Sequence, residues 1–375
     1  MQTNSSEKEW YHITNISEID SPALVIYKHK VIQNINTAIA MVSDVKRLRP
    51  HVKTHKTKEA AQLMMDAGIH KFKCATIAEA EMLAIVNAPD VLLAYQPVGP
   101  KLGRFITLIK KYPATKFSCL VDNIGSAENI AEATAENDLE INVYIDLNIG
   151  MNRTGITPGG EAVNLYATCK NLKGIHPIGL HAYDGHIRTT DIEQRTIECD
   201  NAFKAVIEMQ QQLQQKGFDK PIIIAGGSPT FPIHAKRNVV ECSPGTFVYW
   251  DKTYLRYTEQ NFVPAALVIG RIISLPTDTK LCIDLGHKSI SAENELSNRV
   301  FFLNAPELKF VSHSEEHLVA EAAPGHTYRA SDILYGLPVH ICPTCALYER
   351  ANVIENNIAT TEEWKMIARD RKINV

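Results

Sequence analysis

The sequence has no long apolar run, no excess of charge of one sign and no internal repeat. No stretch approaches the roughly 20 apolar residues that cross a bilayer, and the opening MQTNSSEKEWYH lacks the cationic and apolar segments of a signal peptide. The 39 basic and 42 acidic residues give a formal net charge of -3, which offers no electrostatic reason to expect nucleic acid or an anionic membrane as a partner. We therefore expect a soluble cytoplasmic protein with a small-molecule ligand.

The cysteines form no evident disulfide framework. The eight are scattered, mostly within apolar strand-like or helical runs, which in a cytosolic protein of this size indicates buried thiols. A hydrophobic content of 45% over 375 residues is ordinary globular composition, with length enough for one large domain and a smaller one.

Residues 22–262 alternate short β-branched runs with longer segments of helical period. We expect eight strands, which begin near residues 50, 71, 91, 116, 141, 176, 221 and 239. Eight such units in roughly 230 residues match a closed (β/α)₈ TIM-like barrel better than an open doubly wound sheet. The open sheet is the alternative, because sequence does not show closure.

The pattern changes after residue 262, where short runs separated by turn residues have little helical period. We expect an α/β protein in which the barrel is followed by an antiparallel β domain over 263–375. Residues 1–21 are too few to stand alone and are expected to contribute to the β domain.

The segment PHVKTHK places Lys53 near the end of the first predicted barrel strand, and the carboxyl ends of barrel strands form the active-site face. A lysine becomes a Schiff-base nucleophile when burial or neighbouring cations destabilise its ammonium. His51, His55, Lys56 and Lys58 supply such cations. The alternative is a basic surface loop, since most lysines are solvated.

Two small-residue loops, AGGSPT and SPGT, follow the seventh and eighth predicted strands, where barrel enzymes often bind phosphate. Gly226 and Gly227 let the backbone approach an anion, and Ser228, Thr230 and the amides around Gly245 can donate hydrogen bonds to it. Either loop alone could be a tight turn. Their joint position favours a phosphate site.

The segments IDLNIGMNRTG and GLHAYDGH place Arg153 after the fifth predicted strand and His181 and Tyr183 along and beyond the sixth. Alternate residues of a strand share a face, so His181 and Tyr183 could both face the barrel mouth, with Tyr183 flat against a planar cofactor. His186, beyond the strand end, is a candidate general base. The alternative interpretation is that His186 is a surface histidine.

In PVHICPTC, His340 and Cys342 alternate on a predicted strand, so both could bind one divalent metal, with zinc first. Two protein ligands leave positions open for a substrate or water. Cys345 is either a third ligand or a buried thiol, and we favour burial.

These motifs together resemble the fold-type III pyridoxal-phosphate (PLP) enzymes, and within them the D-threonine aldolase and D-serine dehydratase group. The resemblance covers nearly the whole chain and rests on the order of the segments SPALVIY, RPHVKTHK, IDLNIGMNRTG, GLHAYDGH, GGSPT, SPGTFVYWD, IDLGHKS, SEEH and VHICPT. It implies an alanine racemase-like barrel followed by a β domain. Enzymes of this fold are commonly homodimers with the active site near the interface.

The resemblance also implies a role for each residue. Lys53 would hold PLP, Tyr183 would stack on its ring and Arg153 would lie near its phenolic oxygen. The phosphate of PLP would be held by Gly226, Gly227, Ser228, Thr230 and Gly245. His340 and Cys342 would bind the divalent metal, which is zinc, with manganese as the alternative. His186 would be the second acid or base. Family members often read R-P-G where this chain has Ser243-Pro244-Gly245, so the partner of the ring nitrogen would be a neutral hydroxyl.

The implied reaction is a lyase reaction on β-hydroxy D-amino acids. Either the Cα–Cβ bond is cleaved, as in an aldolase, or the β-hydroxyl is eliminated, as in a dehydratase, and the His-x-Cys pair favours the dehydratase. An amino-acid racemase on the same fold is an alternative that the metal pair disfavours. A non-catalytic PLP-binding protein of a single barrel is disfavoured by about 110 residues that follow the barrel.

Overall fold

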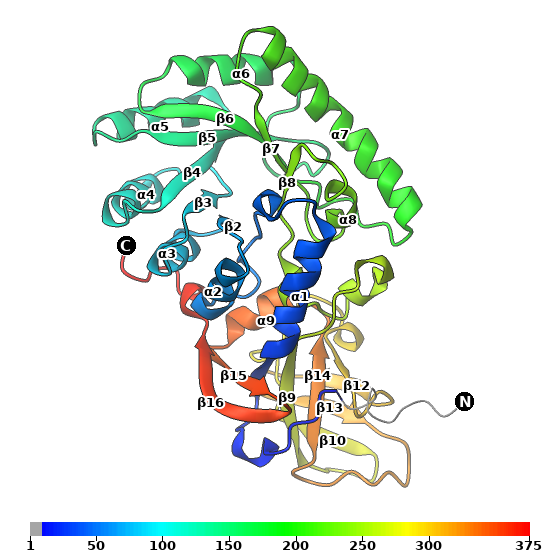
Figure 1. Cartoon of the computed structure of the whole chain (residues 1–375). Helices are drawn as coiled ribbons and strands as arrows, with labels where there is room; N and C mark the ends of the chain where they lie inside the picture. The colour runs from blue at the N-terminus through cyan, green and yellow to red at the C-terminus, as the bar shows by residue number, and fades with distance from the viewer. Residues whose placement is uncertain (1–9) are drawn as a thin grey trace.

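The computed structural model describes residues 10–375, which form a parallel barrel and a second, mixed β-sheet (Figure 1). The barrel strands pair in chain order and comprise β2 (Lys71–Cys74), β3 (Asp90–Leu93), β4 (Lys116–Val121), β5 (Ile141–Leu147), β6 (Ile175–Ala182), β7 (Ile222–Ala225) and β8 (Val240–Cys242). Within this described part of the chain, no helix is long and apolar enough to cross a membrane.

Residues 48–52 fill the eighth position of the barrel without forming a regular strand. Leu48 bridges to Cys242 of β8, and His51 bridges to Lys73 of β2, both in parallel. The amide of Val52 donates to the carbonyl of Lys73 at 2.9 Å. Pro50 interrupts the ladder because it has no N–H to donate. The expected barrel is therefore confirmed, with a bridged segment in place of its first strand.

Helices cover the outside of the barrel, as Figure 1 shows. They are α2 (Lys58–Asp66), α3 (Ile77–Ile85), α4 (Pro100–Lys111), α5 (Ile124–Ala135), α6 (Gly160–Asn171), α7 (Ile192–Gln215) and α8 (Phe231–His234). Several begin at a side chain that accepts a hydrogen bond from the first turn, such as Thr76 at α3, Asn123 at α5 and Asp191 at α7. Short 3₁₀ helices occupy Ile16–Glu18, Val45–Arg47, Thr246–Val248, Tyr254–Arg256, Thr258–Gln260, Leu296–Asn298 and Ile367–Arg369.

The second sheet has the order β12-β13-β10-β9-β1-β15-β16, with β14 also paired to β9 and β11 paired to β14. Its strands are β1 (Ala23–Tyr27), β9 (Ala266–Ser274), β10 (Lys280–Ile283), β11 (Val300–Phe302), β12 (Lys309–His313), β13 (Leu318–Glu321), β14 (Ile333–Pro338), β15 (Arg350–Glu355) and β16 (Ile358–Lys365). Most pairs are antiparallel, as expected. The β1–β15 pair is parallel, so the sheet is mixed.

Strand β1 lies in the mixed sheet, whereas its residues were expected to open the barrel domain at residue 22. It pairs with β9 on one side and β15 on the other. Both of its faces are buried, with Leu24 and Ile26 in one hydrophobic cluster and Val25 and Tyr27 in another. A run buried on both faces does not indicate which sheet it joins. The domain limits beyond this strand stay a prediction.

Helix α1 (Lys28–Met41) then leads from the mixed sheet to the barrel (Figure 1). The segment before β1 packs on the same sheet, because Ile13 and Ile19 are buried in the cluster that contains Tyr27. Residues 1–9, which we also expected to contribute to the β domain, lie outside the described residues.

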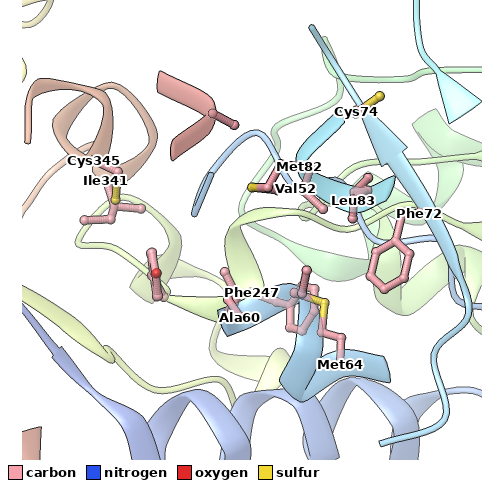
Figure 2. Packing of buried hydrophobic residues seen from close by; sticks show 14 of the residues in the cluster. Val52, Ala60, Met64, Phe72, Cys74, Met82, Leu83, Phe247, Ile341 and Cys345 are labelled. Carbon is pink, nitrogen blue, oxygen red and sulfur yellow. The ribbon is translucent and has the colours of Figure 1, made fainter. Parts of the chain in front are cut away.

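One continuous hydrophobic core joins the barrel to the second sheet. Ile341 and Cys345 of helix α9 (Ile341–Leu347) belong to the same buried cluster as Val52 and Phe247 of the barrel domain, and Figure 2 shows these members of the cluster. All eight cysteines are free, and Cys282 and Cys342 are the two that are only partly buried. The core therefore fixes α9 against the barrel.

We expect Ile341→Ala to lower the free energy of unfolding by about 2–5 kcal/mol, the usual cost of deleting a buried isoleucine side chain. Ile341 is 1% exposed, whereas Leu347 on the same helix is 39% exposed. Leu347→Ala is the matched control and should change stability by less than about 0.5 kcal/mol. Urea unfolding followed by circular dichroism measures both. Equal losses would show that α9 does not depend on this core.

Candidate active site

Lys53 lies in the turn that follows the bridged segment 48–52, at the carboxyl end of the barrel strands, and is partly buried. Its amide donates to Nδ1 of His51 at 3.2 Å. The ammonium of the nearby Lys56 pairs with the buried carboxylate of Glu79. Lys53 lines three neighbouring hollows, one of them a cleft of about 370 Å³. Of the two lysines, Lys53 is the one that faces these hollows.

The Tyr183 ring, just after β6, forms a wall of the same hollows. The guanidinium carbon of Arg153 lies 5.1 Å from the ring centre and Nζ of Lys73 lies 5.5 Å from it. Gly227 lies against the ring from the loop after β7. Lys53, Arg153 and Tyr183 line one hollow together, as expected from their positions at the strand ends.

The two small-residue loops after β7 and β8 are hydrogen-bonded to each other. Oγ of Ser228 accepts from the amides of Gly245 at 3.3 Å and Thr246 at 3.1 Å. Gly226 has a φ of +83°, which favours glycine. A Cβ on Gly245 would lie 3.0 Å from the carbonyl oxygen of His51. The cradle therefore needs glycine at both positions.

A hollow lined by Lys53 also touches Gly227, Ser228, Ser243 and Gly245. Oγ of Ser243 is buried without a hydrogen-bond partner among the residues that the structure describes. A buried unpaired hydroxyl is costly unless a ligand satisfies it. The hollow thus offers an unpaired hydroxyl beside a glycine-lined cradle, which suits a polar or anionic group.

Thr230 does not line this hollow and instead supports the loop from beneath. Its hydroxyl accepts from the amide of Gly227 at 3.2 Å and donates to Asp184 at 2.8 Å. Nε2 of His234 is 2.8 Å from the other oxygen of Asp184. These contacts fix the loop after β7 to the loop after β6.

Asp184, Cys199 and His234 form the only group of at least three potential metal ligands found in residues 10–375. Arg237 donates to Nδ1 of His234 at 2.6 Å, and Nε2 faces Asp184, so both ring nitrogens are engaged. Burial raises the pKa of the Cys199 thiol to about 12. This group is internally hydrogen-bonded, and its contacts are those that support the glycine cradle.

His340 and Cys342 do not alternate on a strand. Strand β14 ends at Pro338, His340 is the residue before α9, and Cys342 lies in the first turn of the helix. The predicted strand was wrong because the β-branched neighbours of His340 favour a strand. Pro343, however, also fits the first turn of a helix. Both side chains nevertheless line the 370 Å³ cleft together with Lys53.

The surroundings of His340 and Cys342 suit a metal pair. Burial lowers the pKa of His340, but Cys342 and Glu293 outweigh burial and raise it to about 9. Burial raises the pKa of the Cys342 thiol, but its bond to His340 outweighs this and leaves the pKa below the usual range. Together they favour a thiolate beside an imidazolium, and a metal that displaces the proton of His340 would find the two ligand types that zinc prefers.

Two other predicted residues lie outside this cleft. Cys345 is fully buried in the core, which confirms the interpretation as a buried thiol. His186 is exposed and lies against Gly150, where an added Cβ would be 2.6 Å from its Nε2. It lines none of the hollows that Lys53 lines. The structure therefore does not bring His186 to the other predicted site residues.

The structure adds site residues that the sequence analysis missed. Arg188, Tyr254 and Glu293 line the cleft from segments that carried no motif. Lys73 is buried on β2 and lines two of the hollows that Lys53 lines. In the sequence, Lys73 could be recognised only as a lysine within the predicted strand that follows the segment carrying Lys53.

The chain matches two family models in succession. The model of the alanine racemase N-terminal domain matches residues 26–253, and a serine dehydratase domain model matches residues 265–354. Among curated proteins, the chain is 25% identical to D-threonine aldolase of Arthrobacter sp. over 366 residues, which cover 94% of each chain. It is 26% identical to D-threo-3-hydroxyaspartate dehydratase of Delftia sp. HT23 over 242 residues, which cover 62% of each chain.

The solved structure of D-threonine aldolase from Filomicrobium marinum has a TM-score of 0.87 and 25% identity, and the match covers 94% of this chain and 96% of that chain. The alanine racemase model alone spans more than half of the residues. With its barrel, its strand-end lysine and its glycine cradle, the chain belongs to the family of the alanine racemase N-terminal domain.

Proposed function

We propose that the protein is a PLP-dependent lyase that eliminates the β-hydroxyl of β-hydroxy D-amino acids. One observation carries the proposal: Lys53 joins the glycine cradle to the cleft that His340 and Cys342 line. A nucleophilic amine, an anion cradle and a metal pair thus share one space. The relatives named D-threonine aldolase and D-threo-3-hydroxyaspartate dehydratase support a D-amino acid substrate.

The residues of the hollow fit PLP. Lys53 would hold it covalently, with the Tyr183 ring against the pyridine ring and Arg153 toward the phenolic oxygen. Gly227, Ser228 and Gly245 would hold the phosphate, and the unpaired hydroxyl of Ser243 would face the ring nitrogen. Gly226 and Thr230 would shape the phosphate loop. When bound, PLP draws electrons from the bonds to the amino-acid Cα.

His340 and Cys342 would hold a divalent metal, with zinc first and manganese as the alternative. Glu293 engages Nδ1 of His340 and fixes the ring, so Nε2 is the nitrogen that would bind the metal. A metal with open positions supplies Lewis acidity to a leaving hydroxyl. Because Lys53 lines the same cleft, its amine can take the Cα proton of an amino acid bound there.

Cleavage of the Cα–Cβ bond is the second candidate reaction, and it needs a base that reaches the β-hydroxyl proton. His186 was the expected base, yet it is exposed and lines none of the hollows described for Lys53. In addition, the second residue after His340 is Cys342, and a carboxylate at that position would favour the aldolase. Elimination needs no such base and is therefore favoured. The homodimer and the cytoplasmic location stay predictions.

Purified protein loaded with PLP should have a visible absorption band that borohydride removes, leaving the label on the peptide that contains Lys53. Lys53→Ala should take no covalent label, because no other residue is proposed to bond to PLP. Lys58→Ala is the matched control and should be labelled as in the wild type. Peptide mass spectrometry locates the label, and a labelled Lys53→Ala protein would contradict the assignment.

Chelation should abolish ammonia release from β-hydroxy D-amino acids while PLP stays bound, because the metal acts on the substrate hydroxyl. Cys342→Ala should lose the metal in the same way, since two protein ligands leave none to spare. Cys282→Ala removes another partly buried cysteine and should keep metal and activity. Metal analysis and the PLP spectrum report the two ligands separately. Parallel loss of PLP and metal would refute this separation.

His186→Ala should change both D-serine elimination and D-threonine cleavage by less than about threefold, because the side chain does not line the cleft. Loss of a general base would instead cost roughly 10²–10⁴-fold. Product analysis by pyruvate, 2-oxobutyrate and glycine assays distinguishes the two reactions. A large loss of D-threonine cleavage alone would restore His186 as the base of an aldolase.

A further inference from the structure

Lys73 is the first member of a buried chain of polar side chains inside the barrel. Its side chain is 3% exposed. Its Nζ lies 3.2 Å from Nε2 of His181 on β6, and Nδ1 of that ring lies 2.7 Å from Asp146 on β5. Lysine is almost never buried without a paired charge, so this position calls for a physical reason.

The hydrogen bonds of His181 determine which of its ring nitrogens faces Lys73, and whether that nitrogen carries a proton. Burial raises the pKa of Asp146, but its bond to His181 outweighs this and leaves the pKa below the usual range. Burial, followed by the charge of Lys73, lowers the pKa of His181. His181 is therefore neutral, with its proton on Nδ1 toward Asp146 and a lone pair on Nε2 toward Lys73.

Lys73 retains donors beyond its bond to His181. An ammonium has three N–H groups, and His181 is the one side-chain hydrogen-bond partner of Lys73 within residues 10–375. By contrast, Lys56 is held by a buried carboxylate, as expected of a structural lysine. The remaining donors of Lys73 are available to a group in the two hollows that it lines.

Those hollows are the ones assigned above to PLP. Lys73 shares one of them with Ser243 and the other with Arg153. Burial, followed by the charge of Lys53, lowers the pKa of Lys73 to about 7. The titratable or charged groups that face Lys73 from the surrounding elements include His51, Lys53, Asp146, Arg153, His181, Tyr183 and Asp184.

We propose that Lys73 is a positioning residue of the PLP pocket, which donates a hydrogen bond to the ring edge of the bound cofactor while His181 and Asp146 hold it in place. The inference rests on the proposed function, because it requires PLP in this hollow. Ser243 brings no charge to the ring, so Lys73 provides a cation that a neutral hydroxyl does not. Protonation of Lys73 then changes the charge beside the ring near neutral pH.

The test compares Lys73→Met, which removes the donor, with Lys73→Arg, which keeps a permanent charge. Wild-type protein with PLP should show a visible band that changes with pH as Lys73 gains or loses its proton. Lys73→Met should lose this transition and bind PLP at least about tenfold more weakly, the effect of one hydrogen bond to a charged group. Lys73→Arg should restore PLP binding without the transition. Spectra and equilibrium titration with PLP need no turnover.

Lys71→Met is the matched control, because it removes the same charge from the same strand at the opposite end of the barrel, where Lys71 pairs with Glu241. It should keep both the midpoint and the PLP affinity. His181→Gln should move the midpoint without abolishing it, since Lys73 remains. If Lys73→Met does not fold, the missing transition in Lys73→Arg carries the test.

The outcomes separate the two proposals. A wild-type protein that binds no PLP would overturn the proposed function and this inference together. A wild-type protein labelled at Lys53 by borohydride, with a Lys73→Met variant of unchanged spectrum, midpoint and affinity, would overturn the role of Lys73 alone. Labelling at Lys73 in the wild type would also overturn it, because Lys73 would then be the covalent attachment site.

Discussion

The backbone hydrogen bonds of residues 48–52 are the constraint on which the site depends. This short segment closes the barrel by bonding to β8 through Arg49 and to β2 through Val52. The buried Arg49 adds two ion pairs, to the partly exposed Asp90 of β3 and to Glu241 of β8, which tie the segment to strands on either side of it. Removal of both carboxylates would leave the buried charge of Arg49 uncompensated. The barrel therefore fixes the position of the residues from which the turn that carries Lys53 begins.

That closure also shapes the glycine cradle. The carbonyl of His51 approaches Gly245 so closely that a Cβ there would force one of them to shift, so the loop after β8 is set by the same segment. Ser228 then fixes the loop after β7 to it, and Asp184 fixes that loop to the end of β6. The donors are held before any ligand arrives, which is the preorganisation that an anion site requires.

Much of this could be predicted from the sequence, because strand periodicity and turn residues are local signals. The strand-end positions of Lys53 and Tyr183 follow from that periodicity. Three features did not follow. The sheet of β1 was missed because the strand is apolar on both faces, the start of α9 because Val339 and Ile341 are β-branched, and the position of His186 because a histidine near a strand end does not reveal which way its loop turns. Lys73 was missed because a lysine in a strand indicates an exposed face unless its buried partners are known. Those partners, His181 and Asp146, are distant in sequence and meet only in the closed barrel.

The two halves of the proposed chemistry are distant in the chain and meet in space at a single residue. Thr54, the residue after Lys53, places its hydroxyl 3.0 Å from Sγ of Cys342. Helix α9 in turn is fixed by Ile341 and Cys345 in the core shared with the barrel. The distance between the amine and the metal pair is therefore set by packing between the domains, not by a flexible loop. A change that loosens α9 should impair the metal pair first, because the glycine cradle and Lys53 are held by the barrel itself.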